Sequence, residues 1–214
     1  MVAVGDLPDG LEDMPPSRKG VQRKTEIVDA ALRVIGRDGI QGVSMRVVAA
    51  EASVPLGTTT YYFKDKDALI AAAFSWHTQR ETARVVAAIA TLGGDLTAAQ
   101  VAGRLADFVI AGLTEHRWQL LTEYEFLNAA ARRDDLQRAS AAWLQSLQAH
   151  LEATVTALGS SSPRTDARLV LSVLAGLEVD HLGAPLQPAA RRAIRATLER
   201  LFAGLDLLWS APTP

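Results

Sequence analysis

The chain has 214 residues, of which 49% are apolar and 21% charged, and it contains no cysteine. This composition is typical of a globular protein with one or two domains, and it excludes a disulfide framework, thiolate zinc sites and cysteine nucleophiles. Aromatic residues reach only 6%, which favours helices over strands and predicts an all-α fold. The most apolar stretch, residues 169–179, is too short to cross a bilayer. Residues 1–16 carry four acidic and no basic residues, the reverse of a secretory signal, so we expect a cytoplasmic protein without a membrane partner.

Basic residues concentrate in one part of the chain. The net charge is −2, but residues 17–66 contain nine Lys or Arg against five Asp or Glu, including all four lysines. Residues 1–16, with three prolines and no helical period, are expected to be a disordered tail. The division predicts a basic module at 17–66 that meets a polyanion and a larger, mildly acidic module at 67–214. A solvated helix face with no partner is the alternative.

The basic module begins with three predicted helices. Apolar residues recur at spacings of three and four over residues 24–39, and a glycine then ends that helix. Ser44 is a plausible cap for a second, short helix whose Val47 and Val48 point inward. Pro55 stops that helix and suits the first turn of a third one, over 55–61. A helix, a tight connection and a short helix together make the outline of a helix-turn-helix.

The remaining chain predicts six further helices and no strand. Asp65 caps the first of them, which ends at Gly93-Gly94, and Thr97 with Gln100 forms a capping box for the second. A Gly-Ser-Ser-Ser-Pro segment over 159–163 is the clearest loop signal. The expected helices lie at 66–91, 97–113, 118–131, 136–158, 164–182 and 188–209, which makes nine in all.

The third helix is unusual in its composition. After Leu56 and Gly57 come three threonines and two tyrosines. A threonine can hydrogen-bond a base edge or pack on a thymine methyl, and tyrosine hydroxyls and lysine ammonium groups suit phosphate oxygens. An exposed polar turn whose tyrosines only cover a small core is the alternative.

From Arg23 to Phe74 the segment resembles the DNA-binding domain of the TetR family of bacterial transcriptional regulators. The resemblance combines apolar spacing, glycine positions and an aromatic-lysine bend in one register. It rests on Gly39-Ile40, Ser44-Met45-Arg46-Val47-Val48-Ala49, Gly57-Thr58 and Tyr61-Tyr62-Phe63 followed by Lys66-Asp67-Ala68-Leu69. It implies double-stranded operator DNA as a partner, no enzymatic activity and no cofactor.

The resemblance also implies which residues contact DNA, and the residues just ahead of the first helix add a phosphate or minor-groove arm. Pro55, Thr59 and Thr60 depart from the family pattern, so which threonine faces DNA stays open, and Thr59 can be turned inward. The predicted contacts are Lys19, Arg23, Ser44, Arg46, Gly57, Thr58, Thr59, Thr60, Tyr61, Tyr62 and Lys66.

Residues 67–214 then correspond to an effector-binding and dimerisation domain. The resemblance implies a homodimer joined by the last two helices, and the alternative is that their apolar stripes serve the subunit's own core. The expected interface residues are Leu169, Val173, Leu177, Ile194, Leu198, Leu201, Phe202 and Leu205.

The fourth to seventh helices are expected to enclose an effector pocket with an apolar wall and a few polar groups. Its tryptophans can instead belong to the core, and Glu125 and Asn128 can instead brace neighbouring helices. Glu178 and His181 share a spacing found in metal-binding bundles, but no second such pair exists, so no metal site is predicted. The expected lining is Trp76, His77, Phe108, Trp118, Leu121, Tyr124, Glu125, Asn128, Trp143, Leu147 and His150.

These features predict a ligand-responsive dimeric repressor, released from a palindromic operator by an unknown small molecule. A DNA-binding regulator without a ligand switch is one alternative. A helical small-molecule-binding protein or enzyme that kept the DNA-binding head as a relic is another, although residues 97–214 offer no acid-base pair at a recognisable spacing.

Overall fold

The structure is a computed structural model, and it describes residues 18–90 and 97–210. The tail predicted at 1–16 and the helix break predicted at Gly93-Gly94 lie outside these residues. Within them the chain forms nine α-helices, a short 3-10 helix and no strand, which confirms the all-α prediction. The elements are α1 (Arg18–Asp38), η1 (Ile40–Gly42), α2 (Met45–Glu51), α3 (Leu56–Tyr62), α4 (Lys66–Ala90), α5 (Ala98–Leu113), α6 (Arg117–Ala130), α7 (Asp134–Ala157), α8 (Pro163–Leu182) and α9 (Pro188–Trp209).

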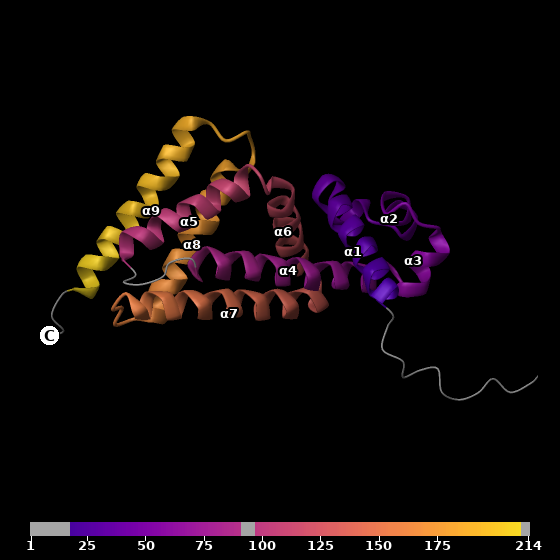
Figure 1. Cartoon of the computed structure of the whole chain (residues 1–214), viewed down its shortest axis with the longest axis horizontal. Helices are drawn as coiled ribbons and strands as arrows, with labels where there is room; N and C mark the ends of the chain where they lie inside the picture. The colour runs from indigo at the N-terminus through magenta and orange to yellow at the C-terminus, as the bar shows by residue number, and fades with distance from the viewer. Residues whose placement is uncertain (1–17, 91–96, 211–214) are drawn as a thin grey trace, which may run out of the picture.

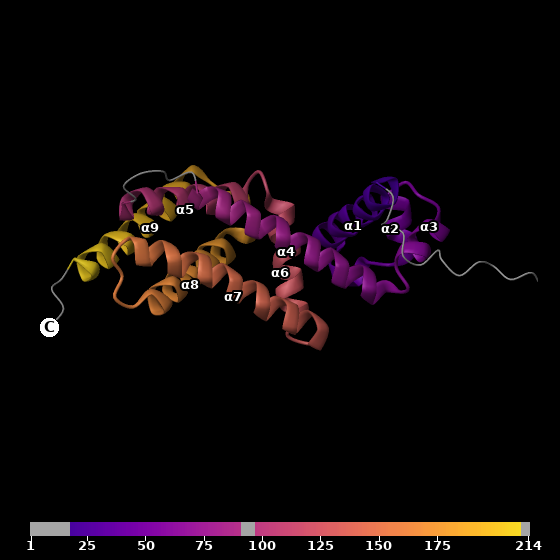
Figure 2. The ribbon, with the colours of Figure 1, turned by 60° about the horizontal axis from the view of Figure 1, so that its bottom comes forward.

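The described helices form an elongated molecule. In Figures 1 and 2 the head formed by α1, α2 and α3 lies at one end of the long axis, and α9 lies at the other. The long helix α4 runs from the head into the body, where α5 to α8 surround its second half. Helix α4 therefore belongs to both parts of the molecule.

The predicted helix caps are present. The Ser44 hydroxyl accepts a hydrogen bond from the backbone N–H of Val47 at 3.2 Å. Asp65 accepts one from the backbone N–H three residues further along, at 2.7 Å. Thr97 and Gln100 form the complete capping box. These interactions use side chains within three residues of each helix start, which is why the sequence pattern was sufficient to predict them.

The expected inward orientation of Val47 is wrong. Its side chain is exposed, while Val48 is fully buried. A helix of only seven residues presents one narrow face to α1, and the position next to a buried residue is turned about 100° away from that face.

The buried apolar side chains form two cores. The first joins α1, α2, α4, α6 and α7, with Phe74, Phe126 and Trp143 among its large members. The second is built mainly from α5, α8 and α9 around Phe202. The first core continues along α4 past Lys66, so the head packs directly on the body. The domain division predicted after Lys66 remains a prediction.

Half of the predicted dimer interface lies in the second core, which corrects the sequence prediction. In α9, Ile194, Leu198, Phe202 and Leu205 are buried against the subunit's own helices, mainly α5. The stripe at spacings of three and four marks the buried face of an amphipathic helix, and the pattern does not say whose core it enters.

Other apolar side chains of α8 and α9 remain accessible. Leu169 is exposed, and Val173, Leu177 and Leu201 are half-buried. The exposed fraction is 55% for Val179, 75% for Leu207 and 69% for Leu208. We call this set of seven residues the α8/α9 apolar face.

Candidate functional site

The exposed turn of α3 is the first candidate site. Tyr61 is 83% exposed, and its ring meets the edge of the Tyr62 ring at a centroid distance of 5.1 Å. A side chain at Gly57 would meet nothing within 4 Å, so the helix surface there is open to another molecule. The Thr60 hydroxyl is exposed and donates to backbone carbonyls of its own helix, at 3.1 Å and 3.3 Å. This arrangement can enter a DNA groove.

Thr59 is not part of that surface, which corrects its place among the predicted DNA contacts. Its side chain is fully buried, and its hydroxyl has no hydrogen-bond partner among the described residues. Thr59 lies on the face of α3 that packs inward, where the family pattern has an aliphatic residue. This agrees with the inward alternative.

The remaining predicted contacts differ in accessibility. Arg46 is exposed, whereas Thr58, Tyr62 and Lys66 are half-buried. Ser44 is exposed but already uses its hydroxyl as the cap of α2. All of these are side chains of the head or of the start of α4.

Two arginines of the head share one glutamate as their ion-pair partner. Arg33 and Arg37 both bind the Glu51 carboxylate, at 2.8 Å and 3.0 Å, respectively. These two guanidinium groups lower the pKa of Glu51 through their hydrogen bonds, so the carboxylate stays ionised. Glu51 therefore offsets part of the positive charge of the head.

Lys19 and Arg23, which were predicted to form an arm just ahead of the first helix, lie instead within α1, where they line a hollow. Lys19, Arg23 and Tyr62 contribute to its wall, together with Glu26. Arg23 binds Glu26 at 2.7 Å, with both groups largely exposed. A phosphate at this hollow would compete with Glu26 for Arg23, which makes Lys19 the more available cation.

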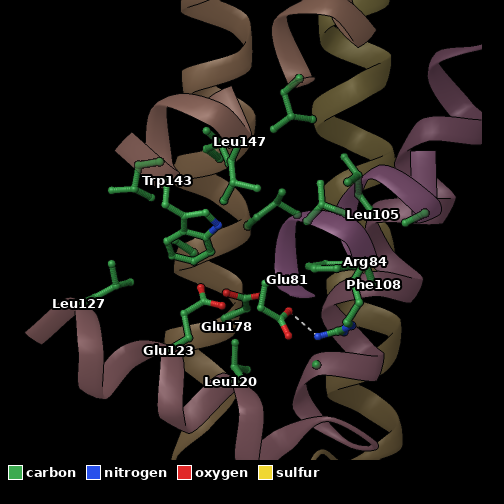
Figure 3. A pocket seen from close by; sticks show the side chains of 18 of the residues that line it. Glu81, Arg84, Leu105, Phe108, Leu120, Glu123, Leu127, Trp143, Leu147 and Glu178 are labelled. Atoms are coloured by element: carbon green, nitrogen blue, oxygen red, sulfur yellow. Dashed lines mark hydrogen bonds and ion pairs between the residues drawn. The ribbon is translucent and has the colours of Figure 1, made fainter. Parts of the chain in front are cut away.

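The second candidate site is a cavity in the body of the molecule, with a volume of about 150 Å³. Five helices line it, from α4 to α8, so the sequence prediction of a pocket between the fourth and seventh helices omitted α8. Figure 3 shows the lining from close by. Its residues are Glu81, Arg84, Val85, Ala88, Leu105, Phe108, Gly112, Leu120, Glu123, Tyr124, Leu127, Trp143, Leu144, Leu147, Leu151, Leu171, Leu174, Ala175 and Glu178.

Three carboxylates and one guanidinium interrupt the apolar wall. Arg84 binds Glu81 on the same helix, and its guanidinium lies over the Phe108 ring at 5.1 Å from the centroid. Glu178 accepts a hydrogen bond from the Tyr124 hydroxyl at 3.0 Å. Within residues 18–90 and 97–210, no Lys or Arg forms an ion pair with Glu123.

Burial controls the protonation of these groups. It is the main cause that raises the pKa of both Glu123 and Glu178 well above the ordinary value, and neighbouring carboxylates raise both further. His77, whose Nε2 lies 3.8 Å from a Glu123 oxygen, has its pKa lowered to about 4, again mainly by burial. His77 is therefore neutral near pH 7 and does not neutralise Glu123.

Four of the eleven predicted pocket residues line the cavity, namely Phe108, Tyr124, Trp143 and Leu147. His77 lies behind the wall, next to the Trp143 and Phe126 rings. Leu121 and Asn128 lie on α6 and His150 lies on α7, all outside the lining. The His150 ring instead bonds to the Ser146 carbonyl at 2.7 Å.

The other predicted pocket residues connect the head to the body. The Trp76 indole donates to Asp29 of α1 at 2.9 Å. Glu125 accepts a hydrogen bond from the backbone N–H of Ile40 at 3.3 Å. Trp118 approaches Gly36 of α1. These side chains brace the junction with α1, and for Glu125 this agrees with the bracing alternative.

The charged residues Glu81, Arg84 and Glu123 were missed as pocket residues. Spacing within one helix predicts the Glu81–Arg84 pair, at positions i and i+3, but an exposed pair has the same spacing. In the sequence, Glu178 stood out only for its spacing of three residues from His181. Its place in the cavity depends on how α8 packs against α6.

Helix α6 contacts both the cavity and helix α1 of the head. One face supplies Glu123 and Tyr124 to the cavity. The opposite face packs on α1, where the buried Thr122 hydroxyl lies 3.3 Å from the Leu32 carbonyl. A methyl group at Gly36 would lie 2.7 Å from that hydroxyl, so only glycine permits this approach of the two helices.

In the part of the chain that the structure describes, no three His, Asp or Glu side chains gather as a metal site would require. The His181 ring bonds to the Leu177 carbonyl at 2.9 Å, while Glu178 faces the cavity. No helix among residues 18–90 and 97–210 is long and apolar enough to span a bilayer.

The two parts of the chain match two families of known sequences. Residues 27–73 match the family described as bacterial regulatory proteins, tetR family, and residues 96–204 match the tetracyclin repressor-like C-terminal domain. These ranges contain the exposed turn of α3 and most of the cavity lining, respectively.

Individual relatives agree with these matches. The chain is 31% identical over 105 residues to the nicotine-responsive transcriptional repressor HdnoR of Paenarthrobacter nicotinovorans, a match over 49% of this chain and 53% of that protein. The chain thus spans about half the length of this curated relative.

Solved structures match over a greater length. A TetR family member from Streptomyces coelicolor A3 is 36% identical, with a TM-score of 0.65, over 84% of this chain and 98% of that one. The multidrug binding protein EbrR complexed with ethidium is 38% identical, also with a TM-score of 0.65, over 84% and 98% of the two chains, respectively. TetR regulators are not enzymes, which confirms that prediction. The chain belongs to the TetR family of DNA-binding transcriptional regulators.

Proposed function

We propose that the protein is a dimeric repressor that releases a palindromic operator when a small molecule enters the cavity between α4 and α8. The observation that carries this proposal is that α4 and α6 each contact both the cavity and the head. Helix α4 supplies Phe74 to the core beneath the head and Glu81 to the cavity. Helix α6 supplies Glu123 to the cavity and Glu125 to the backbone of η1.

A change at the cavity can therefore reach the DNA-binding head through two rigid helices. In a dimer the two α3 helices would enter successive major grooves about 34 Å apart, so a small rotation of each head would change the match to the operator. Moving the population from 1:99 to 99:1 requires about 5.5 kcal/mol of differential ligand affinity. The named ligands of relatives support a small-molecule switch, since HdnoR is called nicotine-responsive and EbrR is complexed with ethidium.

The DNA-binding surface is tested by substitution in the head. We expect Tyr61→Ala and Lys66→Ala to weaken binding to an operator selected from random palindromic DNA, and Lys66→Ala to reduce the salt slope by about one unit. Fluorescence anisotropy between 50 and 200 mM salt measures both quantities. Arg37→Ala is the matched control, because Glu51 and Asp38 already neutralise this exposed arginine. Unchanged affinity in both test variants would contradict the placement of α3 on DNA.

The switch is tested separately with the cavity. We expect Leu147→Trp, which fills the cavity from α7, to keep operator binding but to reduce release by compounds that dissociate the complex of the unmodified protein. If the protein is a regulator without a ligand switch, no compound will release it from the operator. Thermal-shift screening identifies the compounds to be used, because a ligand at 100 times its dissociation constant stabilises the fold by about 2.7 kcal/mol.

A further inference from the structure

The cavity is lined by three carboxyl groups and a single guanidinium group. Arg84 is engaged by Glu81, and its guanidinium is held over the Phe108 ring. Glu123 and Glu178 extend from α6 and α8 into the same space, where Figure 3 shows their carboxylates next to each other. Among the described residues no Lys or Arg forms an ion pair with either one. A buried carboxylate in an apolar wall is stable only when it is protonated or paired with a cation.

The indole of Trp143 provides a second, independent indication of a ligand. Its side chain is more than nine-tenths buried, and its Nε1–H has no hydrogen-bond partner in the part of the chain that the structure describes. Figure 3 shows the indole nitrogen on the side of the ring that faces the cavity. A buried N–H donor without an acceptor is costly, so a molecule in the cavity that offers a lone pair gains this hydrogen bond.

The neighbouring groups do not favour an anion. Beside Glu123 lie Glu81, the neutral His77 and the Tyr124 hydroxyl, which stays protonated because burial and the charge of Glu178 raise its pKa. The Arg84 guanidinium is the one positive group among the lining residues, and Glu81 already binds it. The volume of about 150 Å³ is comparable to cavities that hold one aromatic ring.

We propose that this cavity binds a small heteroaromatic cation, whose positively charged nitrogen lies between Glu123 and Glu178 and whose lone-pair acceptor receives the Trp143 N–H. The inference rests on the proposed ligand switch and adds the charge and the hydrogen-bonding pattern of its ligand. The apolar side chains of α5, α7 and α8 would enclose the ring. The bound cation would serve as the ion-pair partner of Glu123 and Glu178.

Three probes of similar shape separate the parts of this proposal. 3-(Aminomethyl)pyridine carries both the ammonium group and a ring acceptor, benzylamine lacks the acceptor, and 3-pyridylmethanol lacks the charge. We measure their binding to the purified full-length chain by isothermal titration at pH 6.5, where an alkylammonium group stays protonated. We expect 3-(aminomethyl)pyridine to bind most tightly, and 3-pyridylmethanol to bind about tenfold or more weakly, because a charge-assisted contact is lost.

Substitutions then assign the contacts. Glu123→Gln and Glu178→Gln should weaken binding of both amines about tenfold while leaving the alcohol unchanged. Trp143→Phe should abolish the preference for 3-(aminomethyl)pyridine over benzylamine. Glu199→Gln removes the same charge from an exposed position on α9 and should change no affinity. Circular dichroism checks that each variant folds, and the three probes on the unmodified chain decide the charge question without any variant.

Two results would overturn the cation site. One is an alcohol that binds as tightly as the amines, and the other is the absence of binding by all three probes. A gel-shift assay on the same sample keeps this failure separate from that of the proposed function. If 3-pyridylmethanol binds as tightly as the amines and releases the operator, the ligand switch stands and only the cation assignment falls. If the protein does not bind the operator at all, the proposed function fails while the affinities of the probes still test the site.

Discussion

Glu178 illustrates how a single buried carboxylate affects the whole fold. Burial is the main cause that raises its pKa, and the charge of Glu123 raises it further. Between about pH 5 and pH 8 the folded chain therefore binds more protons at this group than the unfolded chain does. The contribution of Glu178 to the free energy of unfolding must fall as the pH rises through this range.

We expect Glu178→Gln to remove that fall. The amide oxygen can still accept the Tyr124 hydrogen bond, but it carries no charge to bury. At pH 8 the free energy of unfolding of the variant should exceed that of the unmodified chain by on the order of 1 kcal/mol, which raises its unfolding temperature. The difference should shrink toward pH 5. Thermal unfolding at four pH values measures it, with Glu199→Gln as the exposed control. Parallel curves for Glu178→Gln and the unmodified chain would show that Glu178 ionises normally.

At the scale of the elements, the contact of α1 with α6 determines how the head is attached. Gly36 allows the two helices to approach so closely that a methyl group would lie 2.7 Å from the Thr122 hydroxyl and 2.8 Å from the Trp118 carbonyl. The second of these atoms belongs to the backbone of α6 and cannot rotate away. Any larger residue must therefore push the helices apart.

We expect Gly36→Ala to destabilise the fold by about 1–3 kcal/mol through this overlap. Gly103→Ala in α5 is the matched control, since a methyl group there meets nothing within 4 Å. Replacing a glycine inside a helix without a clash should stabilise by about 0.5–1 kcal/mol. Urea unfolding of the two variants should therefore give changes of opposite sign. A stabilised Gly36→Ala would mean that α1 and α6 lie further apart.

The junction between α6 and the head should also affect how well a ligand releases the operator. Glu125 joins α6 to the Ile40 backbone at the start of η1, outside both the cavity and the DNA-binding surface. Glu125→Ala should leave the affinity for a cavity ligand within about twofold and should weaken operator release by that ligand, since the coupling between the sites is reduced. Asn128→Ala, on the exposed side of the same helix, is the control. Equal release by both variants would assign the coupling to α4 alone.

At the scale of the whole molecule, the head and helix α9, which carries Leu207 and Leu208, lie toward opposite ends of the long axis (Figure 1). Val179, Leu207 and Leu208 are the most exposed members of the α8/α9 apolar face. Contact with a second chain would remove these large apolar side chains from water. We therefore place the proposed dimer interface on these exposed residues and not on the buried stripe of α9.

Charge on this face should separate the subunits. We expect Leu207→Glu with Leu208→Glu to give a folded monomer in sedimentation velocity, and to lower operator affinity on the order of 100-fold because the second half-site is lost. Val86→Glu, at an exposed apolar position on α4, serves as the control and should remain a dimer. A double variant that sediments like the unmodified chain would exclude this face as the interface.

The amino-acid sequence by itself determined the helices, their caps and the composition of the α3 turn. Hydrophobic period, Ser44, Asp65 and the Thr97 capping box act within a few residues, so these features need no knowledge of the fold. The resemblance in residues 23–74 was correct for the same reason, since that motif is local. The orientations of Thr59 and Val47 in the head required the packing of α3 and α2 to be known.

The tertiary structure alone decided which residues share the cavity and which α9 side chains remain free. Glu81, Glu123 and Glu178 are separated by 42 and 55 positions in the chain, and each lies in a helix whose polar residues mostly face solvent. Nothing in their local spacing distinguishes a carboxylate that faces a cavity from one that faces water. Their meeting depends on how α4, α6 and α8 pack together, and the apolar stripe of α9 likewise depends on α5, because helix period indicates a buried face without naming its partner.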